Sequence, residues 1–214
     1  MSDDLALMDA WKRGDTSAGK DLFERHFDCV FRFLSRKIDH GAEDLVQQTF
    51  VKAIESAARF RGDCGMRSYL LAIARNLLID HFRARAGDRF NPEVDSLVDV
   101  GVSPSTWIAR QQDNKVLLAT LRQLPLSAQT ILELYYWEGL AGEEIAVVLG
   151  ISPHTVRSRL VRARAKLRTL LGEFEDKVVD STATELSEWA ARLAALRAAS
   201  APNSSEDLDA EPNV

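Results

Sequence analysis

The sequence predicts an all-α protein built from two small helical domains. Apolar residues recur at helical spacings of three and four along most of the chain, without a convincing alternation of the kind that marks a β-strand. Residues 87–106 break this pattern, because they contain Asn-Pro and Ser-Pro pairs among scattered acids. We therefore expect a domain over residues 1–86, a flexible linker over 87–106, a second domain over 107–171 and an acidic extension over 172–214.

The first domain is expected to contain four helices. Periodicity places them over residues 4–13, 16–38, 42–58 and 66–86. Either Thr16 or Ser17 is expected to cap the second helix, since both carry a side-chain oxygen at its start. A basic loop over residues 59–65 precedes the fourth helix.

The second domain is expected to end in a helix-turn-helix. Helices over 104–124 and 127–137 lead to a short helix over 142–149, and Gly150 follows its last apolar position, where a helix end favours positive φ. Ser152 and Pro153 then supply an N-cap and a first helical residue. A buried stripe follows at spacings of four, three and four: Val156, Leu160, Ala163 and Leu167.

The charges of this last helix suggest its ligand. Up to residue 168 every charged side chain in it is basic: Arg157, Arg159, Arg162, Arg164, Lys166 and Arg168. A cationic second helix with short polar residues near its N-terminus is typical of a helix that enters a DNA major groove. The alternative is an ordinary amphipathic helix whose arginine face is only solvated.

Net charge is unevenly distributed along the 214 residues. The whole chain carries a formal charge of −5, but residues 172–214 hold ten acidic and three basic side chains, which leaves residues 1–171 at +2. An acidic extension beside a basic domain is typical of nucleic-acid-binding proteins. Within the extension, one helix is predicted by a single apolar seam: Leu186, Trp189, Leu193 and Leu196. The last fifteen residues have the composition of a disordered segment.

The composition argues against several classes of function. Cys29 and Cys64 show neither metal-ligand spacing nor a disulfide framework, which favours reduced thiols in a cytoplasmic protein. Metals and cofactors are therefore not expected. The acidic, polar N-terminus is unlike a signal peptide, and no apolar run is long enough for membrane insertion.

Two stretches together carry a family resemblance. The segments AEDLVQQTFVKA (42–53) and FRGDCGMRSYLLAIARNLLIDHFR (60–83) resemble region two of the extracytoplasmic-function sigma factors of bacterial RNA polymerase. The segment from Leu121 to Arg168 resembles their region four. The resemblance implies a promoter-specificity subunit without catalytic activity. It also implies three partners: the polymerase core, promoter DNA and an anti-sigma factor.

The resemblance implies a role for three groups of residues. The third helix would dock on the β′ coiled coil of polymerase through Glu43, Asp44, Gln47 and Gln48. The minus-ten element would be bound by Arg59, Phe60, Arg61, Arg67, Tyr69, Arg75, Asn76 and Arg83. The minus-thirty-five element would be bound by His154, Thr155, Arg157, Ser158, Arg159 and Arg162, with the β flap contacting the far end of the same helix.

Other functions stay open at this stage. A free-standing helix-turn-helix transcription regulator would need no polymerase-docking face, so the 42–83 segment argues against it. An enzyme acting on DNA would need a carboxylate cluster or a positioned nucleophile, and the acids and histidines are scattered. The acidic extension could cover a basic DNA-binding face, or could serve only to keep the protein soluble.

Overall fold

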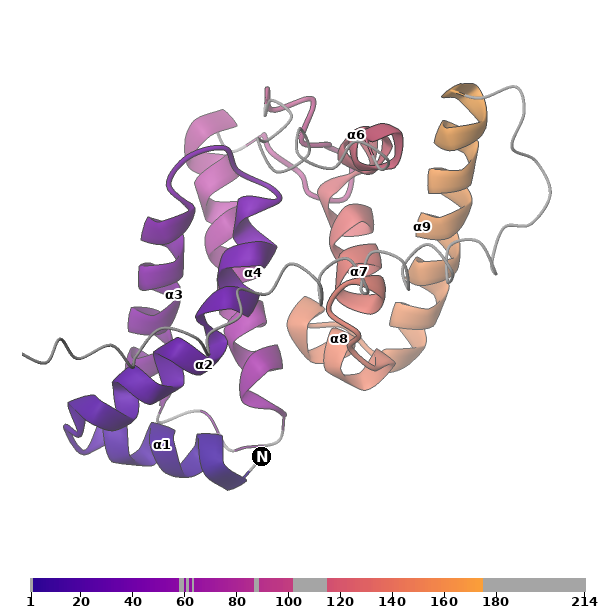
Figure 1. The fold of residues 1–214 in the computed structure, drawn as a ribbon. Helices are drawn as coiled ribbons and strands as arrows, with labels where there is room; N and C mark the ends of the chain where they lie inside the picture. The colour runs from indigo at the N-terminus through magenta and orange to yellow at the C-terminus, as the bar shows by residue number, and fades with distance from the viewer. Residues whose placement is uncertain are drawn as a thin grey trace, which may run out of the picture. The chain divides into compact units, whose positions relative to one another are not determined.

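The computed structural model describes residues 2–57, 60, 62, 64–86, 89–101 and 115–174, and the regular elements within these ranges are all helices (Figure 1). In chain order they are α1 (Ser2–Lys12), α2 (Thr16–Ser35), α3 (Ala42–Glu55), α4 (Met66–Ala86), α6 (Lys115–Gln123), α7 (Leu126–Tyr136), α8 (Gly142–Leu149) and α9 (Pro153–Phe174). The predicted all-α class is confirmed. All of these helices belong to one compact unit, Met1–Val178.

Helix α2 begins one residue after an acidic cap. The Asp15 carboxylate accepts hydrogen bonds from the backbone N–H of Ser17 (3.0 Å) and of Ala18 (3.2 Å). The expectation that Thr16 or Ser17 caps this helix was therefore wrong, because an ionised carboxylate just upstream satisfies the free N–H groups instead. The helix also ends at Ser35, three residues before the predicted end.

The core of the first four helices combines aliphatic and aromatic side chains at its centre and has further aromatic rings at its edge. Leu22, Phe33 and Leu78 are fully buried, whereas Phe23 is only half-buried. The Phe23 ring lies 4.7 Å from that of Phe50 between ring centroids, and 5.2 Å from that of Phe27. This aromatic edge ties α2 to α3 and fixes the orientation of the outer face of α3.

The described part of the predicted linker, residues 89–101, is anchored to the following helices. Phe90 and Leu97 are buried, at 4% and 0% exposure. The N–H of Ser127 donates to the Pro92 carbonyl (2.8 Å) and that of Leu126 to the Asp95 carbonyl (3.0 Å). This segment therefore folds against the start of α7. Residues 102–114, over which part of a helix was predicted, lie outside the described residues.

Helices α8 and α9 form the predicted helix-turn-helix (Figure 1). Gly150 caps α8 at φ +66°, a left-handed conformation that a glycine adopts without strain. The hydroxyl of Ser152 accepts from the N–H of Thr155 (3.2 Å), as expected of an N-cap. The stripe predicted in α9 is buried, with exposures of 1% to 7%: Val156, Leu160, Ala163 and Leu167. The predicted seam over 186–196 lies outside the described residues.

Candidate nucleic-acid and polymerase interface

The outer face of α9 presents the predicted minus-thirty-five residues. His154, Arg157 and Arg162 are exposed, while Thr155, Ser158 and Arg159 are half-buried. Val156 and Leu160 lie on the opposite side of the helix and are buried in the core. The face that carries the predicted residues therefore points away from the domain. A rigid helix with an exposed cationic face can enter a major groove, where an arginine recognises guanine through two hydrogen bonds.

Local hydrogen bonds organise the first turns of α9. The Ser158 hydroxyl donates to the Thr155 carbonyl (3.0 Å), and the Arg162 Nε donates to the Ser158 carbonyl (3.3 Å). Arg162 is thus folded along its own helix. Arg157 is also exposed, but it takes no part in the hydrogen bonds that hold Ser158 and Arg162.

Arg159 contacts a residue far away in the sequence. Its Nη1 donates to Oε1 of Glu93 at 2.7 Å, and both side chains are partly exposed, at 31% and 49%. A carboxylate therefore neutralises this arginine through a charge-assisted hydrogen bond.

Two of the predicted minus-ten residues form an aromatic pair. The rings of Phe60 and Tyr69 are stacked, with 4.4 Å between centroids. The Tyr69 hydroxyl bonds to the Ala53 carbonyl (3.1 Å) and to the Ser56 hydroxyl (2.7 Å), which fixes the ring to the end of α3. The pair is half-buried, so its rings contribute to packing and keep part of their surface open for stacking with another ring. Arg59 and Arg61 lie outside the described residues.

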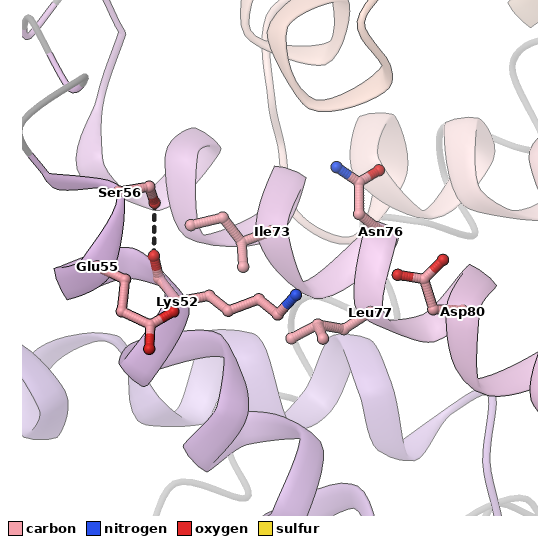
Figure 2. Close-up of a pocket in the computed structure, with 7 residues that line it drawn as sticks. All are labelled: Lys52, Glu55, Ser56, Ile73, Asn76, Leu77 and Asp80. Carbon is pink, nitrogen blue, oxygen red and sulfur yellow. Dashed lines mark hydrogen bonds between the residues drawn. The ribbon is translucent and has the colours of Figure 1, made fainter.

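A groove lies beside Asn76, between the end of α3 and the middle of α4 (Figure 2). Figure 2 shows the Lys52 side chain extending across the groove towards Leu77 and α4, and the exposed Asn76 and Asp80 at the far side. One amide, one ammonium and two carboxylates (Glu55 and Asp80) line the groove, a set of donors and acceptors that can bind polar groups. The Arg83 side chain is exposed on α4, and its Nη1 lies 3.8 Å from Oδ1 of Asp80.

The remaining two minus-ten candidates are less accessible. Arg75 is half-buried, and burial lowers its pKa despite the neighbouring charge of Glu93. Arg67 pairs through Nη2 with the Glu138 carboxylate, and its Nε donates to the Cys29 thiol at 3.1 Å. The structure therefore does not bring Arg67 into the same open surface as Asn76 and Arg83.

The outer face of α3 carries the predicted polymerase-docking residues. Glu43, Asp44, Gln47 and Gln48 are all exposed. On the other side of the helix Leu45 and Val46 are buried, at 6% and 0% exposure. The face thus combines two acidic side chains with two amides and is rigidly held, which suits a specific polar protein–protein contact.

A cluster of buried charges was missed by sequence reasoning. Glu138 has a fully buried side chain and contacts Arg36 (3.1 Å) and Arg67. Glu133 and Lys37 form a second buried pair. Burial raises the pKa of Glu138, but the charges of Arg36 and Arg67 outweigh that effect and hold it below its usual range. One sequence signal was present, since Glu133 interrupts an otherwise apolar stretch of α7, Ile131 to Leu134.

Within the described ranges, no cluster of three or more His, Cys, Asp or Glu side chains is arranged to hold a metal ion. In the same part of the chain, every helix is too short or too polar to cross a bilayer.

Family models match both halves of the described structure. The model of Sigma-70 region 2 matches residues 22–87, and that of Sigma-70, region 4 matches residues 115–167. The first match covers α3, α4 and most of α2, and the second covers α6, α7, α8 and most of α9.

Whole-chain comparisons agree with these matches. The chain is 34% identical over 174 residues to the RNA polymerase sigma factor CarQ of Myxococcus xanthus, covering 80% of this chain and 99% of CarQ. It is 30% identical to the ECF RNA polymerase sigma-E factor of Haemophilus influenzae, covering 75% and 91% of the two chains. Among solved structures, CnrH in complex with the cytosolic domain of CnrY matches with a TM-score of 0.62 at 26% identity, covering 81% and 99%.

This chain contains region two followed by region four, and the matched residues include the exposed α3 face and the helix-turn-helix. A free-standing helix-turn-helix regulator would have no reason to contain region two. The chain belongs to the extracytoplasmic-function sigma factors, the non-catalytic subunits that bind RNA polymerase and direct it to promoter DNA.

Proposed function

We propose that this sigma factor recognises its promoter at two points. Helix α9 binds the minus-thirty-five element as duplex in the major groove, and the surface around Asn76 binds the melted minus-ten element. The outer face of α9 is the observation that carries the proposal: its described charged side chains are cationic and lie opposite a fully buried stripe. Such a helix offers arginines to base edges and phosphates without disturbing its own core.

Arg157 is the residue on which we expect sequence discrimination to depend most. It is exposed in the second turn of α9. An arginine bound to guanine contributes about 1–3 kcal/mol of discrimination against the wrong base, whereas a phosphate contact adds affinity without sequence preference. His154, Thr155, Ser158, Arg159 and Arg162 complete this proposed surface.

The minus-ten surface captures unstacked bases. Opening DNA costs a few kcal/mol per unstacked step, and stacking on an aromatic side chain returns about 1–3 kcal/mol per base. The Phe60–Tyr69 pair supports this role because its geometry is already fixed by the Tyr69 hydroxyl. Asn76 and Arg83 lie on α4 with exposed side chains and complete the polar part of the surface. Arg59, Arg61, Arg67 and Arg75 also belong to the proposed set.

Two protein partners follow from the exposed faces and the relatives. The α3 face of Glu43, Asp44, Gln47 and Gln48 docks on the β′ coiled coil of polymerase, and the far end of α9 meets the β flap. The solved relative CnrH is held by the cytosolic domain of CnrY. By analogy, an anti-sigma factor binds this protein, which acts in the cytoplasm.

Run-off transcription tests the proposal. Core polymerase plus this protein is given a template carrying the upstream region of its own gene. We expect a specific transcript that is lost when Arg157 is changed to alanine and retained in the control Arg13→Ala, an exposed arginine outside the proposed interfaces. A transcript that survives Arg157→Ala unchanged would contradict the role of α9. A variant that loses both transcription and co-elution with core would indicate a folding defect instead.

A further inference from the structure

Helix α1 lies outside both family matches but packs tightly on region two. The region-two match begins at residue 22, whereas α1 ends at Lys12. Met8 of α1 is buried, at 1% exposure, and the helix packs against α2 and α3 (Figure 1). The Trp11 ring lies so close to Gly19 of α2 that a Cβ atom at this glycine would collide with the indole. Helix α1 is therefore a fixed part of the first domain.

Polar contacts anchor the first turn of α1 to α2. Asp3 Oδ2 and Asp4 Oδ1 each accept a hydrogen bond of 2.7 Å from Nη1 of Arg25. The second carboxylate oxygen of Asp4 lies 3.1 Å from Nε2 of His26. The side chains of Asp4 and His26 are only 19% and 11% exposed, so solvent reaches this contact poorly. These contacts fix the position of the next residue, Leu5.

Leu5 contacts the loop between α3 and α4 at a glycine. Gly62 has φ +78°, a left-handed conformation that a glycine adopts without strain. A Cβ atom at this position would lie 3.1 Å from Cδ1 of Leu5 and 3.3 Å from Cδ2, which is closer than ordinary van der Waals contact. The Leu5 methyl groups therefore fill the space directly beside the Gly62 backbone.

The same loop carries part of the proposed minus-ten surface. Phe60 lies two residues before Gly62, and its ring stacks on that of Tyr69 with 4.4 Å between centroids. Backbone hydrogen bonds hold the loop on either side: the Phe60 N–H donates to the Ala57 carbonyl (3.0 Å), and the Tyr69 N–H donates to the Gly65 carbonyl (3.1 Å). Helix α1 supports the loop between these two bonds.

We propose that α1 positions the minus-ten surface and that Leu5 is its positioning residue. The Leu5 side chain supports Gly62, which limits the conformations open to the loop and keeps Phe60 stacked on Tyr69 before DNA binds. Leu5 acts through the loop and not through a contact with DNA. A preorganised loop accepts an unstacked base without first losing backbone freedom. This inference rests on the proposed function for the role of the aromatic pair.

Fluorine NMR tests the positioning without DNA. In the full chain, 4-fluorophenylalanine in place of Phe60 gives a resonance that is sensitive to stacking on Tyr69. We expect one sharp resonance in the parent protein and a shifted or broadened one in Leu5→Ala. Leu7→Ala is the matched control, because Leu7 is also half-buried on α1 but its side chain is rotated by about 200° around the helix. An unchanged resonance in Leu5→Ala, or equal changes in the two variants, would overturn the proposal.

Promoter opening by the holoenzyme measures the consequence for function. Permanganate reactivity of unpaired thymines, on a template carrying the upstream region of its own gene, reports the equilibrium between closed and open complexes. Fixing the backbone of one residue costs a factor of about 5–30 in an equilibrium constant, and we expect Leu5→Ala to lower the opening equilibrium by this factor. Core binding and protection of the minus-thirty-five duplex should stay unchanged, a separation that a general folding defect would not give. Leu5→Met, which has a similar volume, should retain opening.

A second variant covers a folding defect in the first. If Leu5→Ala loses helicity by circular dichroism, Asp3→Asn with Asp4→Asn tests the same support, because it weakens the anchor of α1 and leaves Leu5 in place. Reduced opening with retained core binding is expected, and unchanged opening would overturn the proposal. Failure of the parent holoenzyme to give a transcript would instead contradict the proposed function and leave the fluorine result standing.

Discussion

The outer face of α9 and the cluster around Glu138 use the same residue types in opposite ways. On α9, Arg157 is exposed to solvent beside other cations. In the cluster, Arg36 is 8% exposed and bound to a carboxylate with no exposed surface. Exposed arginines remain available to a ligand, whereas buried ones must be neutralised within the fold. Burial, rather than residue type, therefore separates the binding surface from the contacts that hold the regions together.

The largest expected effect comes from breaking the buried cluster. Glu138→Ala leaves Arg36 buried without this partner, and removal of one member of a buried pair typically costs about 3–5 kcal/mol. The free energy of unfolding from denaturant titration measures the loss. The exposed control Glu24→Ala should change it by less than about 0.5 kcal/mol. Equal losses in the two variants would show that burial does not distinguish these carboxylates.

Acidification should remove part of the folding stability that Glu138 contributes. Although burial alone would raise the pKa of Glu138, Arg36 and Arg67 hold it below its usual range. A carboxyl whose pKa is lowered by folding stabilises the protein above its unfolded pKa of about 4.3, and this contribution is lost as pH falls through the lower folded value. Wild type should therefore exceed Glu138→Gln in stability at pH 6, and the difference should shrink below pH 4. A difference that stays constant from pH 6 to pH 3 would contradict this titration.

On α9 the expected effect is on DNA and not on folding. Arg157→Ala should weaken holoenzyme binding to its promoter by about 1–3 kcal/mol, while the unfolding free energy changes by less than about 0.5 kcal/mol. Filter binding and thermal unfolding measure the two quantities. Leu160→Ala provides the converse control, because Leu160 is 7% exposed and its truncation should destabilise the domain by about 2–5 kcal/mol.

Local patterns predicted the helices well because the determinants lie within one or two turns. Gly150, Ser152 and Pro153 define the turn between α8 and α9, and the stripe from Val156 to Leu167 identifies the buried face of α9. Errors occurred where neighbours compete. Asp15 rather than Thr16 or Ser17 caps α2, because its carboxylate reaches the same N–H groups.

The exposure of a candidate site residue could be predicted where it depends only on the period of its own helix. Glu43 and Gln47 are exposed as expected, since the period of α3 places them opposite Leu45. The position of Arg67 was not predictable, because it depends on Glu138, 71 residues later. Pairing across such a separation leaves no periodic trace in the sequence.

The smallest expected effect concerns the partly exposed ion pair of Arg159 and Glu93. Arg159 and Glu93 are 31% and 49% exposed, so water and salt screen their attraction. A double-mutant cycle with Arg159→Ala and Glu93→Ala should give a coupling energy of about 0.2–1 kcal/mol in unfolding, and this energy should fall further at 1 M salt. The cycle for Arg36 and Glu138 should give a larger coupling that depends less on salt, because both of these side chains are buried. Equal coupling energies with equal salt dependence would mean that the two pairs do not differ in environment. The Arg159–Glu93 pair should therefore be the weaker of the two, because solvent and salt reach it and do not reach the pair of Arg36 and Glu138.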